Sequence, residues 1–201
     1  MTKGAQTRQR IVERAASLFN TQGFAGTSLG DLIAATGLEK GGLYNHFASK
    51  EALALAAFDH AVAILAARYT QALEAHSSAR DKLVALVTTF AAHYDAPPLP
   101  GGCPIFNTMV EADDTHPALR ERAEAAMTAW LKLIGATVRQ GMRSGELRPD
   151  LDPRAVATLV TATLEGALAL SRLYHEPAHL QRAVTHLVWY LRTLELPAGT
   201  R

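Results

Sequence analysis

Stretches of helical periodicity follow one another along the chain, separated by short clusters of glycine, proline, serine and aspartate. The first predicts a helix over residues 7–21, because apolar side chains recur at helical spacing at Ile11, Ala15, Leu18 and Phe19. Gly23, followed by Phe24, is typical of a helix end in which glycine takes a left-handed conformation. We therefore expect this helix to stop at Gly23.

The same periodicity continues to the end of the chain, and almost nothing favours strands. Further helices are predicted over residues 29–36, 40–47, 50–76, a segment ending near Tyr94, 103–113, 117–143, 153–174 and 179–194. Residues 95–104 form the clearest break, because four prolines and two glycines in ten residues cannot continue a helix. The fold class predicted is all-α, with about nine helices.

Several helix ends are marked by specific residues. Ser28 with Asp31 three residues later is an acidic version of the capping box. Gly37 can end the second helix at little cost, since glycine adopts positive φ readily. Asp152 followed by Pro153 predicts a cap and a proline in the first helical position.

Residues 27–53 contain two short helices joined by a glycine turn, with a third helix starting directly after them. This is the size of a helix-turn-helix, in which the second helix enters the major groove of DNA. We expect the contacts with bases and phosphates to come from Thr27, Ser28, Lys40, Gly41, Gly42, Tyr44, Asn45, His46 and Lys50. The alternative is that these are ordinary surface residues of a helical bundle, and their combination at fixed spacing favours the DNA interpretation.

Gly41 and Gly42 lie in the first turn of the predicted helix 40–47, which is the helix expected to enter the major groove. Each costs about 1 kcal/mol of helix stability relative to alanine, so local stability does not explain them. Without side chains they let the backbone approach DNA closely. Leu43 and Phe47 are expected to face inward, against Leu32 and its neighbours.

Charge is distributed unevenly between the start of the chain and the rest. The formal net charge is +1, yet residues 1–50 carry six Lys/Arg and three acids, a local net charge of +3. A basic head suits a phosphate-binding surface. The single Cys103 excludes an intramolecular disulfide, and the charged N-terminal segment lacks the apolar region of a secretory signal. We expect a cytoplasmic protein with no membrane partner.

Residues 7–53 resemble the DNA-binding domain of the TetR family of bacterial transcriptional regulators. The matching positions are Leu18-Phe19, Gly23, Thr27-Ser28, Ile33-Ala34, Gly37, Lys40-Gly41, Leu43-Tyr44, His46-Phe47 and Ser49-Lys50-Glu51. Gly42 departs from the family pattern, in which a threonine is frequent there. The resemblance implies a homodimer whose two heads read a palindromic operator in double-stranded DNA and whose C-terminal domain binds a small-molecule effector.

The helix around residues 155–171 is apolar on nearly every side, which predicts burial on more than one face. A partner subunit is the simplest cover in a chain of this size, and the alternative is a central core helix within one monomer. We expect a two-fold, isologous contact. Its predicted residues are Leu159, Thr163, Ala167, Trp189 and Tyr190.

The C-terminal half offers two candidate sensors. A small-molecule pocket is predicted from apolar and aromatic residues with a few polar tips, namely Phe90, His93, Tyr94, Cys103, Phe106, Met109 and Trp130. They could equally be plain core. Cys103, beside Pro104 at a helix start, could alternatively be a thiol that senses oxidants or electrophiles, or simply an inert buried cysteine.

Three other classes of protein fit the sequence less well. A thiol enzyme would use Cys103 with His93 or His116, but no third group orients such a pair. A metal site would use His175 and His179, which flank Pro177 and so do not share one helix face. A helical interaction module without DNA would not need the spacing of the residues in 27–53.

We predict a ligand-responsive repressor, not an enzyme, with no cofactor or metal. It comprises a DNA-binding domain over residues 1–49 and a regulatory and dimerisation domain over 50–201.

Overall fold

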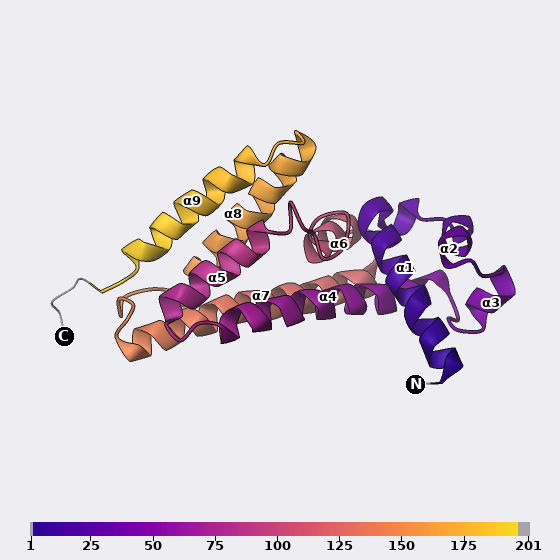
Figure 1. The fold of residues 1–201 in the computed structure, drawn as a ribbon, viewed down its shortest axis with the longest axis horizontal. Coiled ribbons are helices and arrows are strands. Elements are labelled where there is room, and N and C mark those ends of the chain that lie inside the picture. Colours follow the sequence, from indigo (N-terminus) through magenta and orange to yellow (C-terminus); the bar gives the residue numbers. More distant parts are fainter. Residues whose placement is uncertain (1, 197–201) are drawn as a thin grey trace. The chain divides into compact units, whose positions relative to one another are not determined.

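The computed structural model of the protein describes residues 2–196 (Figure 1). Within them are nine helices: α1 (Lys3–Gly26), α2 (Leu29–Thr36), α3 (Lys40–Tyr44), α4 (Lys50–Glu74), α5 (Ala79–Ala91), α6 (Pro104–Ala112), α7 (Pro117–Ser144), α8 (Pro153–Leu173) and α9 (Ala178–Thr193). The only β-type pairing among these residues is an isolated antiparallel bridge between Leu147 and Glu195. The predicted all-α fold with about nine helices is confirmed.

The marked helix ends are formed by the residues predicted for them. At the start of α2, the Asp31 amide donates to Ser28 Oγ (3.1 Å) and the Ser28 amide donates to Asp31 Oδ2 (2.7 Å), which completes a capping box. Hydrogen bonds to the carboxylate from the Ser28 hydroxyl (2.6 Å) and from the Ser28 amide lower the pKa of Asp31. Gly37 ends α2 with φ of 68°. Asp152 caps α8 and Pro153 follows it.

Two helix boundaries differ from the prediction. Helix α1 begins at Lys3, earlier than predicted. Its regular part ends at Gly23 as predicted, where φ is 76° and ψ is 168°, and a short turn continues past this kink to Gly26. Helix α3 is shorter than predicted and ends at Tyr44, where the His46 amide donates to the Leu43 carbonyl (3.0 Å), three residues earlier instead of the four of a regular α-helix.

The described chain divides into two compact units. The first contains the residues up to Leu65 together with Pro97–Ala126, and the second contains Ala66–Ala96 together with the residues from Met127 onward. Helices α4 and α7 each contribute residues to both units.

Each unit has its own buried apolar residues. In the first unit, one cluster joins α1, α2, α3 and the start of α4 through Ile11, Val12, Ala15, Ala16, Leu32, Leu43, Phe47, Leu53, Ala57 and Ala61. In the second, α5, α8 and α9 pack against one another around residues such as Leu86, Leu164 and Leu187. The first cluster holds the short helices α2 and α3 in place.

By length and composition alone, α4 and α8 are apolar enough to cross a membrane. In the structure both helices contribute to the core. Leu53, Ala57, Ala61 and Leu65 of α4 are buried, as are Val156, Val160, Leu164 and Leu168 of α8. The core positions account for much of the hydropathy of these two helices.

Candidate nucleic-acid interface

Helix α3, the helix predicted to enter the major groove, packs against the core on one side and is exposed to solvent on the other. Leu43 is buried and points into the core of the first unit, as does Phe47 just after the helix. Lys40, Gly41 and Asn45 are exposed, and the Tyr44 side chain is 44% exposed despite its aromatic ring. This arrangement presents an ammonium, a phenol and an amide around a short stretch of bare backbone, which suits contacts with phosphates and base edges.

Thr27 and Ser28 lie at the turn between α1 and α2. Thr27 is 0% exposed, and its hydroxyl donates to the Gly23 carbonyl (2.7 Å), so its side chain ties the end of α1 to the start of α2. This corrects the expectation that Thr27 faces DNA. Ser28 is exposed, although its hydroxyl already serves the capping box of α2.

Gly41 and Gly42 differ in what surrounds them. A methyl group added at Gly41 would meet open space, whereas one at Gly42 would touch Leu38 at an ordinary contact distance of 3.6 Å. Packing within the chain therefore does not require glycine at either position. The close approach of another molecule remains as a physical reason for Gly41.

Lys50 and His46 border this surface and are both half-buried. The Lys50 ammonium lies 4.4 Å from the centre of the Phe24 ring, a cation–π contact that holds it beside the kinked end of α1. A phosphate contact of Lys50 stays a prediction, as does the role of His46.

The second unit contains a buried aromatic cluster around His93. His93 is 3% exposed, and its ring centre lies 5.5 Å from that of Phe90 and 5.8 Å from that of Tyr69. Tyr69 in turn contacts Trp130 at 4.5 Å, and Trp130 Nε1 donates to the buried Thr161 hydroxyl (3.0 Å). Sequence reasoning missed Tyr69 and Thr161, which are far from His93 along the chain and carry no motif.

Burial lowers the pKa of His93 to about 4, and the nearby Arg68 guanidinium adds to this effect. The imidazole is therefore neutral at physiological pH. Its Nε2 atom is buried without a hydrogen-bond partner. An orphaned buried polar atom costs about 1–3 kcal/mol and calls for an explanation.

The seven residues predicted to line one pocket belong to different units. Phe90, His93, Tyr94 and Trp130 are in the second unit, and Cys103, Phe106 and Met109 are in the first. Tyr94 lines a groove of about 370 Å³ between α5 and α9, in which Leu180 and Val184 also lie. Cys103 is buried at the start of α6, so its thiol is shielded from oxidants in solution, which argues against a redox sensor.

An exposed apolar stripe runs along α8. Leu159 is 46% exposed, and it is continued at helical spacing by further uncharged exposed residues, Ala162, Gly166, Ala169, Leu170 and Leu173. On α9, Trp189 is 59% exposed, while Thr163 and Tyr190 are half-buried. Ala167 was predicted to belong to this face but is buried within its own chain, because it lies on the opposite side of α8.

The described residues contain no candidate metal site. Within residues 2–196 no three side chains of the types His, Cys, Asp and Glu come together in a way that could hold a metal ion. His116, considered as a base, instead caps α7 by accepting the Leu119 amide at Nδ1 (3.3 Å) and packs its ring against Phe24.

Comparison with known proteins agrees with this geometry over the whole chain. The family described as bacterial regulatory proteins, tetR family, matches residues 11–57, and the family described as tetracyclin repressor-like, C-terminal domain, matches residues 79–187. The HTH-type transcriptional repressor DhaR of Mycobacterium sp. (strain GP1) is 28% identical over 179 residues, which cover 89% of this chain and 88% of that protein.

Solved structures show the same fold. A TetR transcriptional regulator from Chloroflexus aurantiacus J-10-FL has a TM-score of 0.94 and 46% identity, covering 97% of this chain and 98% of that one. The TetR family regulator CifR, solved with a 26-base-pair double-strand operator DNA, has a TM-score of 0.79 and 23% identity over 90% of this chain and 94% of its own. The protein belongs to the TetR family of bacterial transcriptional regulators.

Proposed function

We propose that the protein is a repressor that binds a palindromic operator as a homodimer and releases it when a small molecule binds. The observation that carries the DNA-binding part is α3, whose single buried anchor Leu43 leaves Lys40, Gly41, Tyr44 and Asn45 open to a groove. The relatives support it, since DhaR is a repressor and CifR has been solved on operator DNA. Such a regulator works in the cytoplasm.

The exposed stripe of α8, with Trp189 of α9, supports the dimer. An exposed apolar stripe of this kind, without charged residues, is typical of a protein contact. A two-fold contact would present two copies of α3 to successive major grooves, roughly 34 Å apart along the duplex. Dimerisation thereby sets the spacing of the operator half-sites.

The cluster around His93 supports the effector. A neutral imidazole with an unused Nε2, among Phe90, Tyr69 and Trp130, suits an apolar molecule that carries one hydrogen-bonding group. Binding there would satisfy the orphaned atom, and a coupling of about 1–3 kcal/mol is enough to lower operator affinity 5- to 150-fold.

The test is a titration of duplexes selected by the protein from a randomised library. Tyr44→Ala and Lys40→Ala should each lower affinity at least tenfold while the fold is kept, whereas Lys132→Ala on α7 serves as an exposed control. Affinity should fall steeply with salt because phosphate contacts release counterions. A flat salt response with unaffected variants would contradict DNA binding. Adding small apolar compounds to the same complex tests release by an effector.

A further inference from the structure

Helix α6 and the C-terminal end of α1 are joined by polar contacts that the DNA-reading surface does not use. The buried Asn20 donates from Nδ2 to the carbonyls of Pro100 (2.7 Å) and Gly102 (3.1 Å). Asn107 of α6 donates from its own Nδ2 to Asn20 Oδ1 (3.0 Å) and to the Gly101 carbonyl (2.8 Å). The two amides therefore fix each other and the loop before α6.

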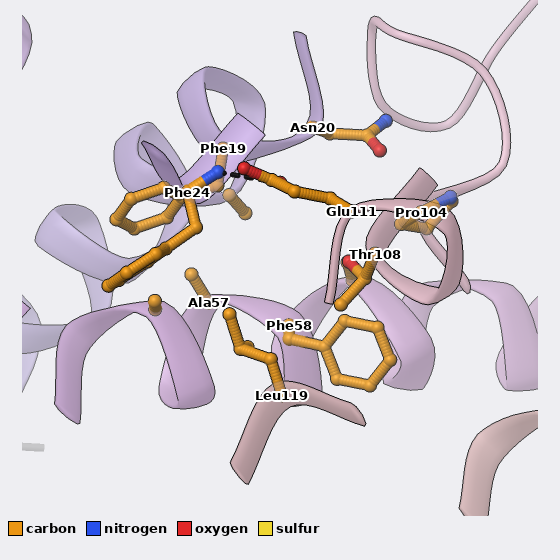
Figure 2. Close-up of a pocket in the computed structure, with 12 residues that line it drawn as sticks. Phe19, Asn20, Phe24, Ala57, Phe58, Pro104, Thr108, Glu111 and Leu119 are labelled. Carbon is orange, nitrogen blue, oxygen red and sulfur yellow. Dashed lines mark hydrogen bonds between the residues drawn. The ribbon is translucent and has the colours of Figure 1, made fainter. Parts of the chain in front are cut away.

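Glu111, one turn further along α6, holds the backbone of α1 directly. Its carboxylate accepts the Phe24 amide at 2.8 Å (Figure 2) and also the Ala25 amide at 2.8 Å. Hydrogen bonds from a backbone amide to a carboxylate are about twice as strong as neutral ones. These two amides come directly after the kink at Gly23.

Together these contacts replace a hydrogen bond of α1 itself. In a regular helix the Phe24 amide would donate to the Asn20 carbonyl, four residues earlier. Here Asn107 Nδ2 donates to the Asn20 carbonyl (3.2 Å), and Glu111 takes the Phe24 amide. Both halves of the interrupted bond are thus completed by side chains of α6.

The approach of α6 is close enough to demand glycine at two positions. Gly23 has φ of 76°, and a Cβ atom there would lie 2.8 Å from the Glu111 carboxylate oxygens. Gly101 has φ of 108°, and a Cβ atom there would lie 2.4 Å from the Asn20 carbonyl oxygen. A larger residue at Gly101 would push the loop before α6 away from the backbone of α1, and one at Gly23 would displace the Glu111 carboxylate.

There is little free space for α6 to shift without disturbing α1. The cavity that α1 and α6 share with α4 and the first turn of α7 holds only about 30 Å³, enough for about two water molecules (Figure 2). Phe19, Phe58 and Leu119 are among the apolar residues that line it. A movement of α6 must carry the end of α1 with it or break the hydrogen bonds.

We propose that Glu111, Asn107 and Asn20 form a latch that sets the direction in which the DNA-reading helices leave α1. The link onward is short, because the Gly23 carbonyl accepts both the Thr27 amide (3.2 Å) and the Thr27 hydroxyl, and α2 begins at Leu29. These three are positioning residues, since they act through α1 and do not touch DNA. The inference rests on the proposed function. In it, an effector weakens DNA binding by releasing Glu111 from the Phe24 and Ala25 amides of α1.

Chain connectivity makes α6 suitable for that step. It is tied through residues 92–103 to α5 and through residues 113–116 to α7, and both α5 and the later part of α7 belong to the second unit. Both connections link α6 along the chain to the second unit, and the hydrogen bonds of α6 link it to the end of α1. The latch also accounts for the distinctive sequence of residues 101–112, which includes the paired glycines, Asn107 and Glu111.

The test compares Glu111→Gln with the wild type on duplexes selected by the wild type from a randomised library, with the half-site spacing then changed by one or two base pairs. The wild type should prefer one spacing. Glu111→Gln should bind that duplex roughly 5- to 150-fold more weakly and show a flatter preference, with unchanged helical content and dimer mass. Glu121→Gln, an exposed change on α7, is the matched control.

Amide exchange gives a readout that does not involve DNA. The Phe24 and Ala25 amides should be protected in the wild type and exchange faster in Glu111→Gln, while the start of α1 stays protected. Asn107→Ala should flatten the spacing preference as well, and it decides the matter if Glu111→Gln does not fold. Unchanged exchange and an unchanged spacing profile would overturn the latch. A wild type that selects no duplex would overturn the proposed function, with exchange still deciding the latch.

Discussion

Two exposed surfaces of this protein differ in chemistry more than in exposure. Tyr44 on α3 and Leu159 on α8 are 44% and 46% exposed. The first stands among an ammonium, an amide and two glycines, and the second stands in a stripe of alanine, glycine and leucine without charge. The first surface suits a hydrated, charged partner and the second suits another apolar surface.

The difference also appears in how each surface is supported. Helix α3 has five residues with a single buried anchor, whereas α8 has 21 residues, nine of them buried. A short helix with two glycines depends on its neighbours for its position, while α8 is held along its whole length. We therefore expect changes on α8 to affect assembly and changes near α3 to affect recognition.

The largest expected effect comes from placing a charge on the α8 stripe. Leu159→Asp would put a carboxylate into an apolar contact, which is costly unless the charge is paired. The dimer should dissociate to monomers at micromolar concentration. Operator affinity should then fall by about 10²- to 10⁴-fold, because the second head no longer binds in the same molecule.

Sedimentation velocity and operator titration would measure this prediction together. Ala129→Asp, at an exposed alanine of α7, controls for the added charge. A Leu159→Asp protein that keeps the mass of a dimer would show that α8 does not form the contact. A monomer with full operator affinity would show that pairing is not needed for recognition.

A smaller effect is expected from the buried histidine of the second unit. With its pKa at about 4, against an ordinary value of 6.5, His93 stays neutral in the folded protein while the unfolded chain takes up a proton. The contribution of neutral His93 to the free energy of unfolding is therefore fully present above pH 6.5. It is lost as the pH drops from 6.5 towards 4. Between pH 7 and 4.5 this should contribute a loss of about 2–3 kcal/mol.

His93→Phe should remove that part of the pH dependence and keep the aromatic packing with Phe90 and Tyr69. Urea unfolding at a fixed protein concentration would report it, with the exposed His186→Phe on α9 as the control. If His93→Phe loses stability with pH as steeply as the wild type, the imidazole is not kept neutral by burial. No corresponding buried histidine lies among the described residues of the first unit.

Local signals in the sequence predicted the elements well. The capping box of Ser28 and Asp31, the left-handed Gly37 and the Asp152-Pro153 start of α8 each depend on residues within four positions of one another. Their chemistry decides the backbone without help from the rest of the fold. For this reason the sequence alone predicts the order of the helices.

Long-range contacts could not be predicted in this way. Asn20 and Asn107 are 87 positions apart, and Glu111 meets Phe24 across the same separation. These contacts hold the turn that follows Gly23, since side chains of α6 complete the hydrogen bond that the kink interrupts. The place of Thr27 beside Ser28 predicts a DNA contact. Only the fold shows that the Thr27 hydroxyl donates to the Gly23 carbonyl instead.

The smallest effect is expected from a change on α3 that should lower operator affinity without lowering the free energy of unfolding. Gly41→Ala adds a methyl group in open space, and alanine favours a helix over glycine by about 0.5–1 kcal/mol. The free energy of unfolding should therefore stay the same or rise, whereas operator affinity should fall because the added group separates the backbone from the groove. Gly145→Ala is the opposite case, since Gly145 has φ of 72° and the change should cost stability without touching DNA. A Gly41→Ala protein with full operator affinity would mean that the bare backbone of α3 does not approach DNA, and that Lys40, Tyr44 and Asn45 alone make the contact.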